Sequence, residues 1–263
     1  MYITKPDYFD RFRCIAGSCP DSCCKEWAVQ VDEASAARYR SLPGALGDRL
    51  REVLCEEDGE TILTIIDGRC PMWRADGLCR IQAELGEEAL CKTCREFPRL
   101  THDYGDFAEL QLELSCPEAA KFILDPGRSL PVTVQADAQA EPEYDQDAMS
   151  VLKTTRETAL NVLFDPALTV PEALAAILIY GCQAQGELDG EEPQPFDPVQ
   201  ALDSAREFLA SADFREITDF FLELEVLTPE WDALLRSPEP APWTEHHRSL
   251  AAYLIQRYWL QAV

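Results

Sequence analysis

The sequence predicts an α+β protein, mainly α, in which a small cysteine-rich α+β part is followed by an all-helical part. Ten of the eleven cysteines lie within the first 116 residues, among short β-rich segments and turn pairs. Beyond residue 125, leucines and aromatic residues recur every three or four positions, the spacing of amphipathic helices. A chain of 263 residues suits one large or two smaller domains. We therefore place one domain at residues 1–125 and a helical domain at 126–263.

The first part contains signals for both helices and strands. Asp32 is a suitable N-cap for a helix that runs to about Arg40, and a second helix is expected at 45–54. The β-rich stretch ETILTIIDG (60–68) ends in an Asp-Gly turn pair. Residues 100–116 alternate like a hairpin with its turn at 104–106. Pro117 then suits the first turn of a helix.

The second part is predicted to be helical throughout. Helices are expected at 144–163, 171–185, 198–211, 213–227 and 245–261. Polar, proline-rich stretches at 125–147, at 185–198 and from 237 onward are predicted to be connections. The aromatic residues of this part have the spacing of core residues, and none has the spacing of a cofactor motif.

The chain is strongly acidic, with a formal charge of −25. Residues 1–116 carry 14 Lys and Arg against 22 Asp and Glu, which gives −8, and residues 117–263 carry 9 against 26, which gives −17. Such a surface repels phosphate backbones, so nucleic acid is not expected as a partner. An acidic surface attracts basic, lysine-bearing protein segments, although its commonest role is to maintain solubility.

The N-terminal and apolar segments predict a cytoplasmic protein with no membrane partner. The chain is charged from Lys5 onward and shows no apolar region typical of a secretory signal. The longest uninterrupted apolar run, Leu174 to Tyr180, is far below the ~18–20 residues that span a bilayer. Cytoplasmic thiols stay reduced. An odd number of clustered cysteines in that compartment favours metal binding over a disulfide framework.

Nine cysteines form the candidate site. Thiolates are soft ligands that suit zinc or iron–sulfur clusters rather than magnesium or calcium, and local pairs such as C-x2-C supply two ligands from one turn. Nine thiols exceed the needs of one tetrahedral zinc. They suit one cluster plus a zinc, two zincs, or one site with spare thiols. The candidates are Cys14, Cys19, Cys23, Cys24, Cys70, Cys79, Cys91, Cys94 and Cys116.

Several enzyme classes are excluded by spacing. A radical S-adenosylmethionine enzyme uses C-x3-C-x2-C, whereas Cys14, Cys19 and Cys23 are spaced C-x4-C-x3-C. A Rossmann dehydrogenase or methyltransferase needs a glycine-rich strand–helix turn, and the sequence contains neither a G-x-G nor a P-loop. A thioredoxin-like role for C-K-T-C lacks the surrounding βαβ pattern.

Four motifs together resemble a known family. They are C-x3-CC-x2-W at 19–27, C-P-x7-C-x-I at 70–81, C-x2-C-R-x-F-P-R at 91–99 and L-S-C-P-E-A-A at 114–120. This combination is similar to that of the flagellin lysine-N-methylase (FliB-like) family, and more broadly to the YkgJ-like group of zinc- or iron-chelating cysteine-cluster proteins. The resemblance covers about residues 8–125. The nine cysteines match the pattern of the family, whereas Cys55 and Cys182 match nothing in it.

The resemblance implies an iron–sulfur cluster, 4Fe–4S, held by these cysteines. It also implies methyl transfer from S-adenosylmethionine to lysine side chains of flagellin or a similar protein. From another class, a non-enzymatic zinc- or iron-binding protein-interaction domain remains the alternative. Glu96, Asp103 and Tyr104 lie near the cysteines in sequence, but position alone favours structural roles, so no catalytic or methyl-donor residue is assigned.

Overall fold

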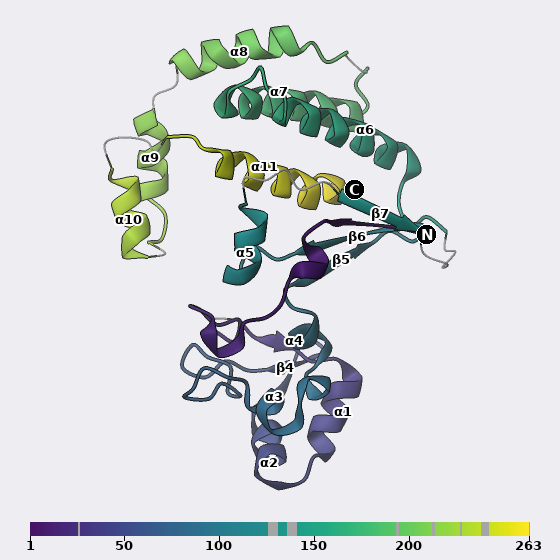
Figure 1. Ribbon diagram of the computed structural model, residues 1–263, viewed down its shortest axis with the longest axis vertical. Helices are drawn as coiled ribbons and strands as arrows, with labels where there is room; N and C mark the ends of the chain where they lie inside the picture. The colour runs from purple at the N-terminus through teal and green to yellow at the C-terminus, as the bar shows by residue number, and fades with distance from the viewer. Residues whose placement is uncertain are drawn as a thin grey trace. The chain divides into compact units, whose positions relative to one another are not determined.

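The chain divides into two compact units in a computed structural model that describes residues 1–25, 27–125, 131–135, 141–192, 195–211, 214–226, 228–237 and 242–262. The first unit contains residues 1–123 and 129–143, and the second contains 124–128 and 144–263. Strands lie in the first unit and the second is helical (Figure 1). The α+β, mainly α class predicted from the sequence is confirmed.

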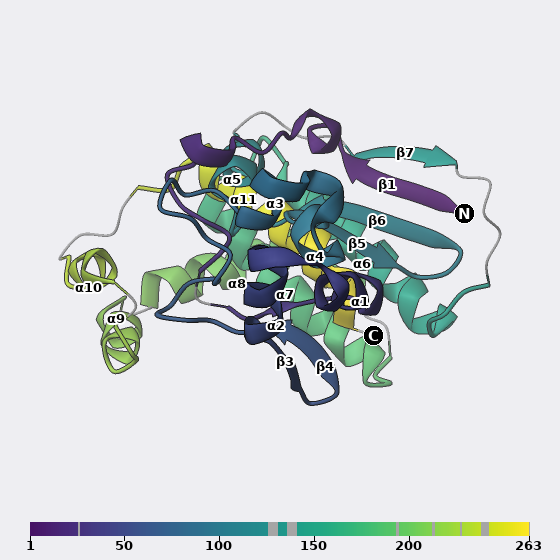
Figure 2. The same ribbon diagram turned by 90° about the horizontal axis from the view of Figure 1, so that it is seen from below.

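A four-stranded sheet forms one part of the first unit. Its order is β5-β6-β1-β7 (Figure 2), with β1 parallel to β6 and antiparallel to β7. The antiparallel pair β5 and β6 is the predicted hairpin. The strands β1 and β7 were not expected, because each is short and β7 lies in a stretch that was assigned to a connection. The strand bounds are Tyr2–Pro6 (β1), Arg99–Asp103 (β5), Phe107–Leu112 (β6) and Pro131–Gln135 (β7).

The hairpin turn requires a glycine. Gly105 has a φ of +90°, a conformation that residues with a side chain rarely adopt. A Cβ at this position would lie 2.1 Å from the carbonyl oxygen of Glu141. The backbone N–H of Glu143 donates to the carbonyl of Tyr104 at 3.1 Å. The segment after β7 therefore packs directly on the turn, and only glycine fits there.

A second layer of the first unit carries most of the cysteines. Its short helices surround an antiparallel sheet of order β2-β4-β3. The predicted cap is confirmed, because the Asp32 carboxylate accepts a hydrogen bond from the N–H of Ser35 at 3.0 Å. The β-rich stretch forms a strand over only four residues before the turn. The bounds are Val29–Gln30 (β2), Glu33–Ser41 (α1), Gly44–Val53 (α2), Leu54–Glu57 (β3), Glu60–Leu63 (β4), Arg80–Leu85 (α3) and Lys92–Glu96 (α4).

The core of this layer is apolar and includes two of the cysteines. Helices α1 and α2 contribute Tyr39 and Leu50, which are 1% and 0% exposed. The remaining buried members come from the same two helices, the sheet, α3 and the segments between them: Val29, Val31, Ala36, Leu46, Val53, Leu63, Cys70, Met72, Ile81, Ala89, Leu90 and Cys91. The thiols are thus part of the structure that holds this layer together.

Short helical segments complete the first unit. Helix α5 (Pro117–Ile123) begins at proline, as predicted. The ring of Phe122 in α5 stacks on Tyr8 at 6.1 Å, which joins α5 to the segment after β1. The 3₁₀ turns are η1 (Phe9–Arg11), η2 (Ala16–Ser18) and η3 (Glu87–Ala89).

The second unit is a set of helices whose core lies between α6, α7 and α11. Small residues let the helices approach closely, and Trp259 donates a hydrogen bond to Thr155 at 2.9 Å. The core contains Ala159, Leu163, Ala173, Ile177, Tyr180, Ala252 and Ile255. The bounds are Gln146–Leu163 (α6), Val170–Leu188 (α7), Pro198–Ser211 (α8), Phe214–Leu222 (α9), Pro229–Leu235 (α10), Glu245–Tyr258 (α11) and Trp259–Ala262 (η4).

Most of the predicted helices are confirmed, with two corrections. The helix predicted at 213–227 ends at Leu222, and α10 was not expected because seven residues are too few to show periodicity. Thr228 caps α10 through the N–H of Trp231 at 3.1 Å. Residues 213, 227 and 238–241, on which parts of these predictions fall, lie outside the described residues.

Within the described ranges, no helix combines the length and the apolar composition needed to cross a membrane.

Candidate functional site

Three of the predicted ligands form a chain of hydrogen bonds at the start of the site. Cys23 and Cys24 lie on one turn, and the thiol of Cys23 donates to Cys24, whose own thiol donates to Cys70. The main chains of the two segments are also hydrogen-bonded, since the N–H of Cys70 donates to the carbonyl of Cys24 at 2.7 Å. The cysteine run of residues 14–24 and the C-P-M-W segment are therefore joined twice.

Two further predicted ligands directly precede helices. Cys79 precedes α3 and Cys91 precedes α4, in the N-cap position of each. The backbone N–H groups of Ile81 and Gln82 act to lower the pKa of the Cys79 thiol. Unpaired N–H groups at a helix start favour the charged form of a thiol. At Cys79 burial outweighs this effect and raises the pKa, whereas at Cys91 the N–H of Cys94 contributes to a lowered pKa.

The C-K-T-C segment forms a second pair. Cys94 lies one turn after Cys91 in α4, and its thiol and its N–H both donate to the sulfur of Cys91. This hydrogen bond lowers the pKa of Cys91 to about 7, and it raises the pKa of Cys94. A C-x2-C spacing across one helical turn therefore places two sulfurs side by side, with one of them prepared for deprotonation.

The pKa shifts of the other thiols come from hydrogen bonds between thiols and from burial. The hydrogen bond from Cys24 lowers the pKa of Cys70. For Cys24 the hydrogen bond from Cys23 lowers the pKa, but the bond to Cys70, burial and the neighbouring thiols raise it to about 12. Burial raises the pKa of Cys79. In the Cys24–Cys70 and Cys91–Cys94 pairs the pKa of the accepting thiol is lowered, which favours its thiolate form, and the donor stays a thiol.

Five of the six cysteines border the apolar core, whereas Cys23 is exposed. Cys91 is 1% exposed and Cys70 is 6% exposed, while Cys24, Cys79 and Cys94 pack against the same core. The charges of Cys24, Cys79 and Cys91 all act on Cys94, so the two pairs and Cys79 interact electrostatically. This environment limits water, which is the condition under which soft thiolate–metal bonds are favoured over hydration.

The donor set fits a soft metal in its chemistry, but its side chains are arranged as pairs. Among the described residues, no group of three or more His, Cys, Asp or Glu side chains has the arrangement needed to hold an ion. In this part of the chain the thiols therefore form hydrogen-bonded pairs rather than a preformed cage of three or four sulfurs.

The other three predicted ligands form a second group. Cys14 and Cys19 flank η2, and Cys116 precedes α5. The sulfur of Cys14 accepts the N–H of Ala16 at 3.4 Å. Burial raises the pKa of Cys116, and the thiols of Cys19 and Cys14 contribute to the shift. The nine cysteines of the sequence motifs are thus found as a group of six and a group of three.

Two cysteines lie outside both groups. Cys55 is exposed on β3 and Cys182 is exposed on α7. Histidine contributes capping contacts instead: His247 accepts the N–H of Thr244 at 3.0 Å, and His246 lies 2.6 Å from the carbonyl of Leu124.

The aromatic residues of the motifs fix the cysteine loops. The indole N–H of Trp27 donates to the carbonyl of Cys23 at 2.8 Å, and its ring lies 6.5 Å from that of Phe97. Arg69 and Trp73 flank Cys70 in the sequence, and the guanidinium of Arg69 lies over the ring of Trp73 at 4.2 Å. The tryptophan of C-x3-CC-x2-W and the phenylalanine of C-R-x-F-P-R therefore belong to one contact.

Helix α1 is a part of the site that sequence reasoning missed. Asp32 also accepts the N–H of Lys92 at 2.8 Å. Arg38 donates to the carbonyls of Glu88 and Ala89 at 3.0 and 2.8 Å, and Tyr39 donates to Ala89 at 2.7 Å. These long-range contacts carry no local sequence signal beyond the N-cap.

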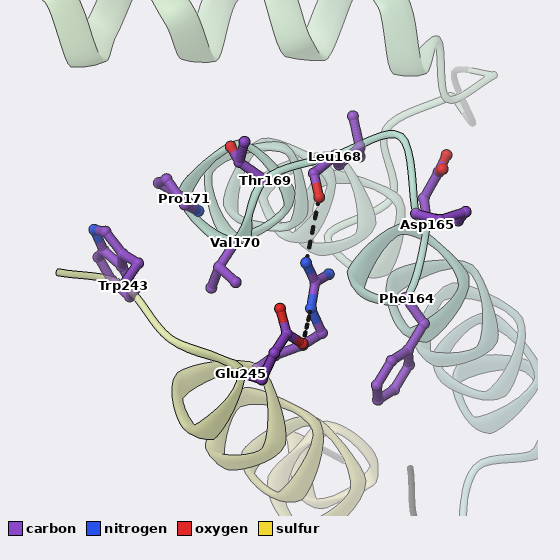
Figure 3. A pocket seen from close by; sticks show the side chains of 10 residues that line it. Phe164, Asp165, Leu168, Thr169, Val170, Pro171, Trp243 and Glu245 are labelled. Atoms are coloured by element: carbon purple, nitrogen blue, oxygen red, sulfur yellow. Dashed lines mark hydrogen bonds and ion pairs between the residues drawn. The ribbon is translucent and has the colours of Figure 1, made fainter. Parts of the chain in front are cut away.

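The helical unit contains a cavity of about 550 Å³ between the end of α6 and the starts of α7 and α11 (Figure 3). Arg248 pairs with Glu245 at 2.9 Å and donates to the carbonyls of Leu163 and Leu168. These three contacts engage the guanidinium of Arg248. The two carbonyl contacts connect α11 to the end of α6 and to the segment between α6 and α7. The lining contains no cysteine: Phe164, Asp165, Pro166, Leu168, Thr169, Val170, Pro171, Trp243, Glu245 and Arg248.

Comparison with known proteins gives three related sequences. The chain is 33% identical over 130 residues to the flagellar biosynthetic protein FliU of Salmonella muenchen, covering 47% of this chain and 77% of that protein. It is 33% and 32% identical, again over 130 residues, to the lysine-N-methylases of Salmonella typhimurium and Salmonella choleraesuis.

The match to the methylases is partial, since the aligned region spans 32% of their length. No protein-family model matches the chain, and no solved structure matches it. The coverage of FliU, together with the cysteine motifs, establishes the relationship. The chain therefore belongs to the FliB-like family that contains FliU and the lysine-N-methylases.

Proposed function

We propose that this protein is a lysine N-methyltransferase acting on flagellin or a similar protein, with a cysteine-ligated iron–sulfur cluster in its first unit. The observation that carries the proposal is the position of the paired thiols in a chain whose relatives are named lysine-N-methylases. The six-cysteine group offers enough thiols for the ligands of a cluster. Cys24, Cys70, Cys79, Cys91 and Cys94, which border the apolar core, would hold this centre, with Cys23 as a further candidate ligand.

The reaction needs a neutral lysine amine. A lysine with a pKa of ~10.4 is almost fully protonated at neutral pH, so a base or a desolvating surface must remove the proton first. The nitrogen lone pair then forms the new N–C bond to the methyl group of S-adenosylmethionine. The S–C bond breaks and its electrons remain on sulfur, which leaves S-adenosylhomocysteine. The acidic surface favours a basic, lysine-bearing substrate.

Methyl transfer tests the proposal directly. Protein purified without oxygen is incubated with methyl-labelled S-adenosylmethionine and flagellin, and the label on lysine is identified by peptide mapping. Flagellin whose lysines are acetylated is the control for the acceptor, because an amide nitrogen has no lone pair available for methyl transfer. We expect label on the first flagellin and none on the second. Absence of transfer from cluster-replete protein to any lysine-bearing partner would contradict the methylase function.

A second function is favoured by one observation. Cys70 and Cys91 are members of the apolar core, and a metal bound there would stabilise the fold of the first unit. Structural zinc sites contribute on the order of 10 kcal/mol in small modules. A non-enzymatic zinc- or iron-binding interaction domain would therefore give colourless protein with stoichiometric zinc and no methyl transfer.

A further inference from the structure

We infer that Asp32 is a positioning residue for the Cys91–Cys94 pair, and that α1 acts through it as the support of the C-K-T-C segment. The inference names a residue outside the cysteine motifs. It rests on the proposed function only where it concerns metal binding, because the placement of the two thiols can be measured without metal.

The carboxylate of Asp32 serves two helices at once. One oxygen, Oδ1, accepts the N–H of Ser35 in the first turn of α1 at 3.0 Å. The other oxygen, Oδ2, accepts the N–H of Lys92 at the start of α4 at 2.8 Å. Lys92 directly follows Cys91, and α4 is only five residues long. One side chain thus fixes the N-termini of both helices.

The rest of α1 holds the chain just before Cys91. Arg38 donates to the carbonyls of Glu88 and Ala89, and the hydroxyl of Tyr39 donates to Ala89 at 2.7 Å. Together with Asp32, these side chains bind main-chain atoms on both sides of Cys91. The Cys91 side chain is 1% exposed, so the main chain determines where its sulfur lies.

Such a contact should affect metal affinity more than it affects folding. Groups that orient metal ligands from outside the coordination sphere change affinity by roughly 10- to 100-fold when they are removed. Asparagine can replace Asp32 as the cap of α1, because asparagine caps a helix about as well as aspartate. The two N–H groups contact different oxygens of Asp32, and in asparagine one of those oxygens is replaced by an NH2 group, which cannot accept the N–H that it faces.

The chain offers a matched control in the other unit. Asp145 is the N-cap of α6, and its Oδ1 alone accepts both N–H bonds, from Asp147 and Ala148 at 3.0 Å each. Asp145→Asn therefore keeps every capping bond, whereas Asp32→Asn loses one. Asp32→Ala and Asp145→Ala form a second pair, in which both caps are removed completely.

The experiment combines two readouts on the full chain. In metal-free protein, alkylation of each cysteine is timed and assigned by peptide mapping. In parallel, Co²⁺ is titrated and its tetrahedral thiolate absorption bands are recorded. We expect Asp32→Asn to speed alkylation of Cys91 roughly 10-fold and to weaken Co²⁺ binding by roughly 10- to 100-fold. Both Asp145 variants should match the unmodified protein in both readouts.

The outcomes separate this inference from the proposed function. Faster alkylation of Cys91 in protein that binds no metal would support the positioning role and count against the metal centre. Alkylation and Co²⁺ affinity that are the same in Asp32→Asn, Asp32→Ala and the Asp145 variants would overturn the inference. Loss of Co²⁺ binding with altered bands in Asp32→Asn alone would support both.

Discussion

The N–H of Cys70 donates a 2.7 Å hydrogen bond to the carbonyl of Cys24, and the thiol of Cys24 donates to the sulfur of Cys70. This double link joins the N-terminal cysteine run to a loop that is distant in sequence. A cysteine substitution in this group therefore affects both the ligand set and the contact between two loops.

Cysteines of the six-membered group should be needed for bound metal. We expect Cys23→Ser and Cys94→Ser to lower the metal content per chain, because each removes a sulfur from a hydrogen-bonded pair. Cys182→Ser is the matched control, since Cys182 is exposed on α7. Elemental analysis of protein kept free of oxygen gives the measurement. An equal loss in all three variants would mean that the ligand assignment is wrong.

Tyr39→Phe should destabilise the first unit without changing its shape. The hydroxyl of Tyr39 donates to the carbonyl of Ala89 at 2.7 Å, and the side chain is 1% exposed. Its removal leaves the carbonyl of Ala89 with the hydrogen bond from Arg38 alone, and the loss of one hydrogen bond costs about 0.5–1.5 kcal/mol in the free energy of unfolding. Urea unfolding measures the change. Tyr258→Phe, at a residue that is 49% exposed, should have no comparable effect.

Glu172 should make the second unit sensitive to acid. Hydrogen bonds from the hydroxyl and N–H of Thr169, at 2.7 and 3.0 Å, and the ion pair with Arg206 lower its pKa to about 2 from 4.5. Because the pKa is lowered by folding, the stabilisation is present above pH 4.5 and is lost as the pH falls towards 2.

The variant Glu172→Gln tests that dependence. At neutral pH we expect a lower midpoint of thermal unfolding than in the unmodified protein, since the charge-assisted bonds are weakened. The difference should shrink as the pH falls from 4.5 to 2. Glu207→Gln, at an exposed residue of α8, controls for charge alone. A difference between Glu172→Gln and the unmodified protein that is independent of pH would show that the carboxylate does not supply the stabilisation.

Metal removal should act on the first unit alone. A ligand that binds only the folded state adds about 2.7 kcal/mol when its free concentration is 100 times its dissociation constant. Because the thiols lie in the core with α1 and α2, chelation should increase hydrogen exchange in those helices. Exchange in α6 and α7, whose core contains no cysteine, should stay the same. An equal increase in both units would contradict a site confined to the first.

Local sequence signals account for many of the elements. The Asp32 cap, the hairpin with Gly105 and the proline that opens α5 all follow from residues close together in the chain. The strands β1 and β7 could not be predicted in this way. They pair with each other although they lie at opposite ends of the sequence of the first unit, as in the contact of Thr4 with Thr133 at 3.1 Å. Neither strand is long enough to show an alternating pattern by itself.

In the candidate site, too, local features could be predicted from the sequence and long-range contacts could not. The residue types and spacing of C-x2-C at Cys91 and Cys94 predict a thiol pair in one helical turn, and that pair is present. The division of nine cysteines into groups of six and three depends on which loops meet. So does the second contact of Asp32 with Lys92. Such long-range contacts are set by the folded chain and leave no spacing in the sequence.

The most direct test of the central claim is the metal, sulfide and visible absorbance of the protein purified without oxygen. The account predicts brown protein with iron and acid-labile sulfide in equal amounts, and loss of both in Cys94→Ser but not in Cys182→Ser. Colourless protein that contains neither iron nor zinc, with its thiols all free to react, would contradict it.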